Sequence, residues 1–351
     1  MMKSQNRANS MRFGLIGCGN FGVELGKYFL EVGEIVAVCD VLRERAGATA
    51  KALGLEASVY ADFQELIDQQ SLDAVVVTAA NFAHAEIACA AARAGLHVFC
   101  EKVMATSLEE CWEMVRTARQ HNVKLMVGHK RRLRVSWSRM IALTDDALLG
   151  EPLAITVTQY ADMRPYDYPG TWWADPKLSG GTFSPLGVHV IDWFRAMCGD
   201  AESVCALYGP QVEAGYQFPD LVHAMYRFQS GALATLNTSF MYPLQKFREA
   251  QGPMVQCRHG GMKLVPEMDV IHLHWQRLDE QEAHHEQFSI EDDFSPAYRR
   301  EIGDFVRWVS EDREPCLSWV EGLRCVEMME GAYRSAQEDG RRIDFPLMDE
   351  T

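Results

Sequence analysis

Short apolar runs alternate with longer mixed segments along the first 130 residues. The apolar runs predict strands over residues 11–16, 34–38, 74–77, 97–100 and 124–127. The segments between them are typical of helices, over residues 21–30, 43–53, 84–94 and 108–121. Strands and helices that alternate through short connections indicate a parallel sheet with helices on both faces. We therefore expect an α/β domain over residues 11–132, preceded by a flexible extension of residues 1–10.

The pattern changes between residues 131 and 150. Runs rich in β-forming residues follow, spaced by glycine and proline turns, with one helical segment near residues 187–197; the runs cover residues 153–160, 224–228, 232–240 and 270–275. This texture predicts an α+β domain over residues 133–345 with a large, mainly antiparallel sheet. Helical character returns over residues 296–339, and we expect these last helices to pack back against the N-terminal domain.

Composition excludes several classes of partner. The chain has 48% hydrophobic and 24% charged residues, and its formal charge is 34 − 49 = −15. An acidic surface repels nucleic acids and anionic membranes, so neither is expected as a partner. No apolar run has the length that a bilayer requires, and the polar start does not resemble a secretory signal. Ten scattered cysteines without a Cys-x-x-Cys pair fit a reducing cytoplasm.

A glycine turn is the first candidate for chemistry. Directly after the first predicted strand stands Gly17-Cys18-Gly19-Asn20-Phe21-Gly22, which opens the first predicted helix. In this context the first glycine permits a tight turn, the second lets the backbone approach a pyrophosphate, and the third allows close packing of helix and strand. The helix N-terminus then offers N–H groups and a positive dipole end to the phosphates. A turn without any ligand is the alternative.

Asp40 narrows the choice of dinucleotide. It ends the second predicted strand, at about the distance from the turn where an acid accepts hydrogen bonds from ribose hydroxyls. A carboxylate there repels a 2′-phosphate, which favours NAD over NADP. Val41 stands beside it in the expected ribose region. Arg43 is close enough in sequence to weaken this preference, or is simply an exposed residue at a helix start.

Five stretches in a fixed order resemble one family, the glucose–fructose oxidoreductase / inositol dehydrogenase / MocA family. Beyond the glycine turn with Asp40, they are Asn81 to Glu86 (similar to Thr-Pro-Asn-x-x-His), Gly95 to Lys102 (similar to Gly-x-His-Val-x-x-Glu-Lys-Pro), Gly180-Gly181 through Gly187 to Asp192, and the tail Tyr298 to Glu301 with Phe305, Gly322-Leu323 and Ser335. The resemblance spans nearly the whole chain.

The resemblance implies a Rossmann domain followed by a domain whose open sheet often forms an oligomer interface, so we expect a homodimer or homotetramer. It implies sugars, glycosides, cyclitols or related diols as substrates. It also implies catalysis by Lys102 and His189. Beyond the glycine turn, the resemblance implies cofactor contacts in the predicted Rossmann domain at Ala79, Asn81, His84, Glu101 and Lys102.

The chemistry of these two residue types suits alcohol oxidation. Lys102 follows a strand, at the carboxyl edge where doubly wound sheets bind ligands. A lysine whose pKa is lowered by burial can accept the proton while NAD accepts the hydride. His189 would share or relay that proton, or orient the hydroxyl. A surface lysine and a helix-start histidine are the alternatives.

Further residues are candidates for substrate binding. Asp192 follows His189 by three residues, so both lie on one helix face. The others combine aromatic and cationic side chains, each of which has a purely structural alternative: Lys130, Arg131, Tyr160 and Trp172. His272, His274 and the pair His284-His285 invite a metal assignment, but Ile271, Leu273 and Trp275 alternate with the first two, which places them on the polar face of a strand. We therefore predict no metal.

Four positions depart from the family pattern. Pro185 stands where the family often has an aspartate four residues before its histidine. Val103 replaces the proline of Glu-Lys-Pro, Ala79-Ala80 replaces Thr-Pro, and Trp173 replaces an arginine that often follows the tryptophan. The nucleotide half thus follows the family more closely than the catalytic half does.

Three functions remain open from the sequence. The first is an NAD(H)-dependent oxidoreductase that acts on a sugar, glycoside, sugar acid or cyclitol. The second is a redox-neutral enzyme with tightly bound NAD, in which transient oxidation permits elimination, hydrolysis or epimerisation. The third is a non-enzymatic regulator that senses a dinucleotide, which the presence of Lys102 and His189 disfavours.

Overall fold

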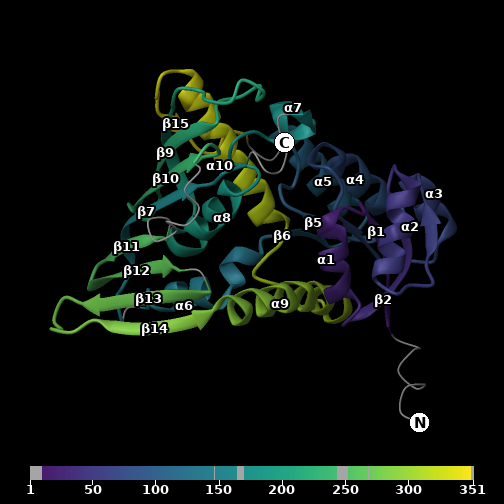
Figure 1. The fold of residues 1–351 in the computed structure, drawn as a ribbon, viewed down its shortest axis with the longest axis horizontal. Coiled ribbons are helices and arrows are strands. Elements are labelled where there is room, and N and C mark those ends of the chain that lie inside the picture. Colours follow the sequence, from purple (N-terminus) through teal and green to yellow (C-terminus); the bar gives the residue numbers. More distant parts are fainter. Residues whose placement is uncertain (1–9, 146, 164–169, 243–251, 268, 349–351) are drawn as a thin grey trace, which may run out of the picture. The chain divides into compact units, whose positions relative to one another are not determined.

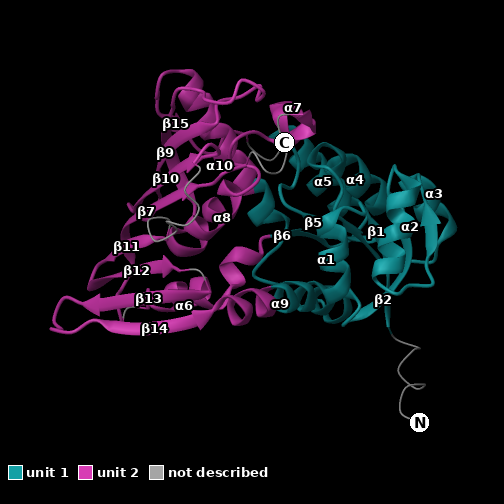
Figure 2. Cartoon of the chain, viewed as in Figure 1, with its two compact units in different colours: residues 1–128, 298–323 teal, residues 129–297, 324–351 magenta. Residues whose placement is uncertain are grey.

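The computed structural model describes residues 10–145, 147–163, 170–242, 252–267 and 269–348. The chain forms two compact units (Figure 2): unit 1 comprises residues 1–128 and 298–323, and unit 2 comprises residues 129–297 and 324–351. The extension expected at the N-terminus lies outside the described residues, except for Ser10. Within the described part, no helix is both long and apolar enough to cross a bilayer.

Unit 1 contains a six-stranded parallel sheet in the order β3-β2-β1-β4-β5-β6. Its strands are β1 (Met11–Ile16), β2 (Gly33–Cys39), β3 (Ser58–Tyr60), β4 (Ala74–Val77), β5 (His97–Glu101) and β6 (Leu125–Gly128). In the sheet, β1 lies between β2 and β4. The chain extends from β1 through β2 to β3 on one side and then continues with β4 on the other, so the strand order reverses at β1. Ligands bind doubly wound sheets at such a reversal, at the carboxyl ends of the strands.

The helices of unit 1 connect successive strands, as Figure 1 shows. They are α1 (Asn20–Phe29), α2 (Arg43–Ala52), α3 (Phe63–Gln69), α4 (His84–Arg93) and α5 (Leu108–Gln120), with a short 3₁₀ helix η2 (Asn81–Ala83) before α4. The predicted parallel α/β architecture is confirmed. β3 and α3 were not predicted, because a strand of three residues and a helix of seven carry too little periodic pattern to detect.

The C-terminal part of the chain contributes to unit 1. Residues 298–323 include the second half of α9 (Ile290–Glu311) and the first turn of α10 (Trp319–Gln337). Tyr298 stacks on Tyr28 with ring centroids 4.8 Å apart, and Phe305 meets Phe99 edge-to-face at 5.7 Å. A segment distant in sequence therefore completes the core of the nucleotide unit.

Unit 2 contains a nine-stranded sheet in the order β14-β13-β12-β11-β7-β10-β9-β8-β15. Only the β7–β10 pair is parallel among these strands. They are β7 (Pro152–Tyr160), β8 (Ala201–Tyr208), β9 (Leu221–Phe228), β10 (Leu233–Ser239), β11 (Met254–Cys257), β12 (Gly260–Pro266), β13 (Val270–Arg277), β14 (His284–Ser289) and β15 (Ile343–Asp344). The predicted mainly antiparallel sheet is confirmed.

The two faces of this sheet differ in burial. Along β9 buried and exposed residues alternate strictly, as expected for a strand covered on one side. Tyr226, on the buried face, donates a hydrogen bond to the carbonyl oxygen of Met328 in α10. Met225 and Met254, on the opposite face, have exposed fractions of 46% and 56%. Helices α8 (Gly187–Cys198) and α10 thus cover one face, whereas the other exposes apolar side chains.

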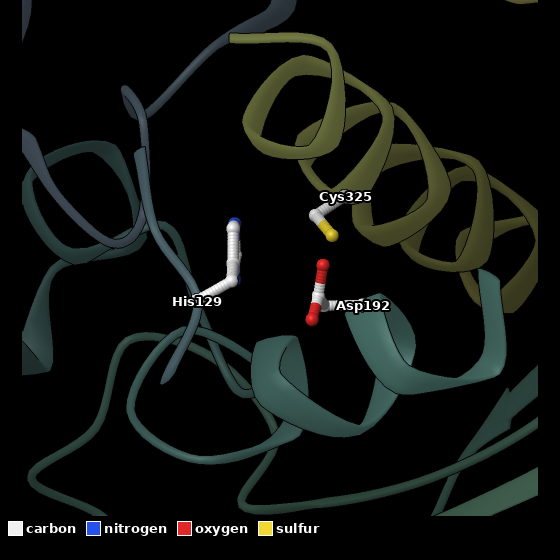
Figure 3. Close-up of side chains that lie close together, drawn as sticks. All are labelled: His129, Asp192 and Cys325. Carbon is white, nitrogen blue, oxygen red and sulfur yellow. The ribbon is translucent and has the colours of Figure 1, made fainter. Parts of the chain in front are cut away.

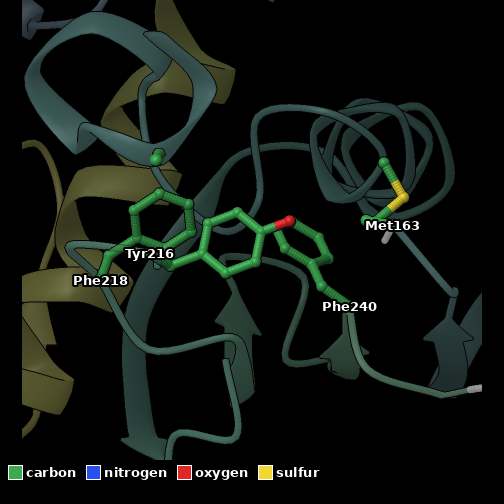
Figure 4. Packing of buried hydrophobic residues seen from close by; sticks show 5 residues of the cluster. Met163, Tyr216, Phe218 and Phe240 are labelled. Atoms are coloured by element: carbon green, nitrogen blue, oxygen red, sulfur yellow. The ribbon is translucent and has the colours of Figure 1, made fainter. Parts of the chain in front are cut away.

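A cluster of mainly aromatic side chains packs together the segments that follow β7, β8 and β10 (Figure 4). The ring of Tyr216 lies 5.2 Å from that of Phe218 and 5.8 Å from that of Phe240, and Met163 joins the same cluster. All four side chains are buried. The remaining short helices of unit 2 are η3 (Lys130–Leu133), α6 (Val135–Ala142), η6 (Trp172–Ala174) and α7 (Pro176–Ser179).

Candidate functional site

The turn between β1 and α1 leaves no room for side chains at two of its glycines. Gly17 has a φ of +99°, and a Cβ there would lie 2.3 Å from the backbone nitrogen of Ala79. A Cβ on Gly22 would lie 2.2 Å from the carbonyl oxygen of Gly17. These contacts are with backbone atoms, which cannot move aside without shifting β4 or α1. The tight turn expected from the sequence is therefore present.

Gly19 has the opposite environment. A Cβ placed on it would meet no protein atom within 4 Å. Gly19 is also the N-cap of α1, where it contributes no capping side chain. An anion at this position would meet backbone N–H groups and the positive end of the helix dipole. The turn therefore has the space and the polarity to accept a pyrophosphate. Asn20 and Phe21, which begin the helix, are both exposed.

Asp40 is hydrogen-bonded to the same turn. Its Oδ2 accepts a hydrogen bond of 2.9 Å from the backbone N–H of Cys18, and its Oδ1 accepts one of 2.9 Å from Leu42. Arg45 places Nη1 3.6 Å from Oδ1. The carboxylate is buried, whereas the Arg45 side chain is half exposed. Arg45, rather than the Arg43 noted in the sequence, forms the ion pair with Asp40. Val41 and Arg43 are exposed next to it.

Thr78 is a residue of the turn that sequence reasoning missed. Its buried hydroxyl donates a hydrogen bond of 2.5 Å to the carbonyl oxygen of Gly17. It immediately precedes Ala79-Ala80, which stand in place of the family's Thr-Pro. A threonine one position earlier could have indicated that a hydroxyl supports the turn from β4.

Lys102 follows the last residue of β5. Glu101 is buried, and its Oε2 accepts a hydrogen bond of 3.2 Å from the backbone N–H of Lys102. The Lys102–Val103 peptide bond is cis, although residue 103 is not proline. Lys102 itself is half-buried. Val103 stands at the position where the family pattern has its proline.

His84 joins the loops after β4 and β5. Its Nδ1 lies 2.8 Å from the carbonyl oxygen of Val103, and its Nε2 lies 3.1 Å from that of Ala79. Burial lowers the pKa of this imidazole, although both backbone contacts oppose that shift. Because both ring nitrogens face the backbone, His84 holds the Lys102 turn in place. Asn81, also buried, begins η2 beside it.

His189 lies in the first turn of α8, within unit 2. It is buried, and its ring meets that of His129 edge-to-face, with centroids 6.4 Å apart and planes at 88°. Pro185, four residues earlier, is also buried. His129 was not singled out from the sequence, because nothing in its local pattern distinguishes it from other residues that follow a strand.

Asp192 is fully buried one helical turn after His189. Nε of Arg132 donates to its Oδ2 at 2.8 Å, and Nη2 donates to its backbone carbonyl oxygen at 3.0 Å. Figure 3 shows Asp192 and Cys325 on the same side of the His129 ring, and donor atoms of these three residues lie within 4.8 Å of one another. Arg132 already supplies the positive charge that this carboxylate requires, so we assign no metal to the cluster.

The other predicted substrate residues also belong to unit 2. Lys130 and Arg131 lie in η3, and the Arg131 guanidinium stands 5.1 Å from the ring centroid of Trp137. Burial, with Arg134 nearby, lowers the pKa of Arg131 to about 9, which leaves it charged at neutral pH.

Two aromatic candidates make contacts with other rings or polar groups. The hydroxyl of Tyr160 lies 3.3 Å from Nε2 of His223. The rings of Trp172 and Trp173 stack at 4.3 Å, and both are partly exposed. Their substrate roles remain predictions.

The histidines of β13 and β14 form a stack on the open side of the sheet. His274 and His285 are exposed, with ring centroids 4.5 Å apart, and His272 lies 5.2 Å from His285. Nδ1 of His272 lies 3.0 Å from Nε2 of His285, so these two nitrogens interact with each other. This arrangement agrees with the polar strand face predicted from the sequence.

Comparison with known protein families covers both units. Residues 11–129 match the family model described as an oxidoreductase family with an NAD-binding Rossmann fold, and residues 143–345 match its C-terminal alpha/beta domain. The chain belongs to the Gfo/Idh/MocA oxidoreductase family. Its nucleotide unit is therefore an NAD-binding Rossmann domain, as the glycine turn and Asp40 predicted.

Two curated members of the Gfo/Idh/MocA family extend over nearly the full chain. Inositol 2-dehydrogenase/D-chiro-inositol 3-dehydrogenase of Lactiplantibacillus plantarum is 26% identical over 97% of this chain and 95% of its own. D-xylose 1-dehydrogenase (NADP(+)) 2 of Haloferax volcanii is 26% identical over 95% of this chain and 100% of its own.

A solved structure shares the fold. The WlbA dehydrogenase from Bordetella pertussis, in complex with NADH and UDP-GlcNAcA, superposes with a TM-score of 0.81 at 24% identity, covering 97% of this chain and 100% of its own.

Proposed function

We propose that the protein transfers hydride between NAD(H) and a secondary alcohol or ketone of a sugar, glycoside, sugar acid or cyclitol. The names of its relatives support this substrate class, since they include dehydrogenases of inositol and xylose. The observation that carries the proposal is the combination of an open glycine turn with a half-buried lysine at the carboxyl edge of the same sheet.

The residues of unit 1 fit NAD. The empty space before Gly19 accommodates the pyrophosphate, and Asp40 offers a buried carboxylate at the ribose position. Thr78 and His84 hold the turns on either side of Ala79 by hydrogen bonds to the backbone. When bound, the nicotinamide supplies the hydride acceptor for alcohol oxidation.

Lys102 and His189 are the residues we assign to the proton. In the oxidation, the neutral amine of Lys102 accepts the hydroxyl proton as the hydride leaves. In the reduction, its ammonium returns that proton to the carbonyl oxygen. His189 shares the proton or orients the hydroxyl, and Lys130, Arg131, Tyr160, Trp172 and Asp192 are the candidates for substrate recognition.

One departure from the family pattern, at Pro185, supports a second function. Pro185 can neither transfer a proton nor hydrogen-bond a hydroxyl, so the usual lysine, aspartate and histidine set is incomplete. A redox-neutral enzyme would need only a transient oxidation by trapped NAD, followed by elimination, hydrolysis or epimerisation. NAD that co-purifies and never appears as free NADH would favour this function over an exchanging dehydrogenase.

The test of the main proposal compares Lys102→Ala with Lys51→Ala. NADH formation is screened with sugars, glycosides, sugar acids and inositols, and NADH binding is followed by fluorescence. We expect Lys102→Ala to lower kcat about a thousandfold, within the range for loss of a general acid–base, with the Kd for NADH changed less than twofold. Lys51 is exposed in α2, so its variant should behave like the wild type. Turnover retained by Lys102→Ala would contradict the assignment.

A further inference from the structure

The surroundings of His189 contain a second imidazole that the family resemblance does not assign. We propose that His129 is a positioning residue, which fixes the ring plane of His189 where Pro185 has replaced the family's usual aspartate. The proposal rests on the function assigned above, because it requires His189 to handle a substrate proton. It concerns only residues of unit 2.

The contact between the two rings is direct. Their centroids are 6.4 Å apart and their planes are nearly perpendicular, at 88°. This is an edge-to-face arrangement, which aromatic rings prefer over a face-to-face stack. The torsion that rotates an imidazole about its last bond has broad, shallow minima, so a free ring samples many planes. Packing against a perpendicular ring selects one of them.

His129 is itself held by other groups. It is completely buried, and one of its nitrogens lies within 4.8 Å of both a carboxylate oxygen of Asp192 and the sulfur of Cys325. Arg132 holds Asp192 through its side chain and its backbone carbonyl oxygen. The ring of His129 therefore contacts the ring of His189 and also lies close to Asp192, which is paired with Arg132. Figure 3 shows His129 beside Asp192 and Cys325.

This arrangement comes from three separate segments. Arg132 belongs to η3, Asp192 and His189 to successive turns of α8, and Cys325 to α10. A side chain supported from several elements has little freedom to move, as a group that orients an acid–base residue must have. Pro185 offers no hydrogen-bonding side chain for this purpose. The orientation of His189 is therefore assigned to His129, the residue that precedes η3.

The test compares two replacements of His129. His129→Phe keeps an aromatic ring of similar width and its edge-to-face contact, whereas His129→Ala removes the ring. On the substrate identified with the wild-type enzyme, we expect His129→Ala to lower kcat about tenfold, at the low end of acid–base effects. KM and the Kd for NADH should change less than twofold, and His129→Phe should restore kcat to within about threefold of the wild type.

His121→Ala is the matched control, since it removes an imidazole that is exposed at the end of α5 in unit 1. Its kcat should stay within twofold of the wild type, and thermal unfolding of all three variants should show that they fold. An unchanged kcat in His129→Ala would overturn the proposal, and so would equal losses in the Ala and Phe variants. Absence of any turnover by the wild type would instead contradict the proposed function. In that case, ¹⁵N spectra of His189 still report whether its ring is more mobile in His129→Ala, and unchanged mobility would overturn the inference.

Discussion

The glycine turn of unit 1 and the surroundings of His189 in unit 2 are held by different kinds of atoms. At Gly17 and Gly22, the atoms that exclude a side chain belong to the backbone. Around His189, the neighbours are side chains such as His129, which in turn meets Asp192. Backbone constraints admit one residue type, whereas a side-chain environment can be rebuilt with other residues. This difference explains why the nucleotide half follows its family more closely than the catalytic half.

The largest effect should come from breaking the backbone constraint. In Gly22→Ala, the new methyl would meet the carbonyl oxygen of Gly17 at 2.2 Å, so the turn must shift. We expect unit 1 to lose about 2 kcal/mol of stability, as for overpacking, and NADH affinity to fall about a hundredfold, or about 2.7 kcal/mol. Thermal unfolding without cofactor and NADH fluorescence titration measure the two effects.

Gly19→Ala sharpens the same comparison. Its methyl meets no protein atom within 4 Å, so the unfolding temperature without cofactor should not change. NADH affinity should still fall about tenfold, or about 1.4 kcal/mol, because the methyl occupies the space we assign to the pyrophosphate. Full NADH affinity in Gly19→Ala would place the cofactor elsewhere.

The open face of the sheet in unit 2 extends the comparison to a surface whose interactions depend on side chains alone. Met254 is 56% exposed there, and the family resemblance predicts that this face joins a second copy of the chain. Met254→Glu should weaken self-association roughly thirtyfold, or about 2 kcal/mol, because each copy would bury an unpaired charge. Light scattering after gel filtration, over a range of concentrations, measures this change.

Leu278→Glu is the control for the sheet face. Leu278 is 81% exposed in the turn after β13, outside the strands that form this face. Its variant should associate like the wild type. A wild-type protein that is monomeric at all concentrations would contradict the prediction of a homo-oligomer.

Cofactor choice should respond more modestly to changes beside Asp40. Asp40→Asn keeps the shape and one of the two acceptor oxygens but removes the charge that repels a 2′-phosphate, so the NADPH-to-NADH affinity ratio should rise about tenfold, or about 1.4 kcal/mol. Arg45 lies 3.6 Å from that carboxylate, and in the Asn variant its guanidinium is available to a phosphate. Adding Arg45→Gln should reverse most of the gain, whereas adding Arg43→Gln should not; equal effects of the two arginine changes would deny Arg45 this role.

The smallest effect concerns the cysteines of the nucleotide unit. Burial, the largest cause, raises the pKa of Cys18 and of Cys39 to about 12, from an ordinary value of 9.0. Both thiols are therefore neutral at pH 8, and their contribution to stability, complete below pH 9, is lost as the pH rises toward 12. Exposed Cys316 should react first with a thiol reagent at pH 8, and Cys316→Ser should abolish the fast phase. Rapid modification of Cys18 with loss of NADH binding would contradict this expectation.

Several elements could not be predicted because their pattern is short or their partners are distant. β3 has three residues, which is too few for alternation to be visible. The ion pair of Arg45 with Asp40 depends on the path of the chain from β2 into α2, and the sequence drew attention only to Arg43 near Asp40. His129 and Arg132 gain their roles only from α8, since Arg132 and Asp192 are 60 residues apart.

The sequence by itself determined the parallel α/β unit, the glycine turn, Asp40 and the family. These features depend on local spacing and on backbone geometry, which allow few residue types at each position. Only the tertiary structure decided which side chains surround His189, which arginine pairs with Asp40 and which sheet face stays uncovered. Those outcomes follow from packing between segments far apart in the chain, where many residue combinations satisfy the same space and charge.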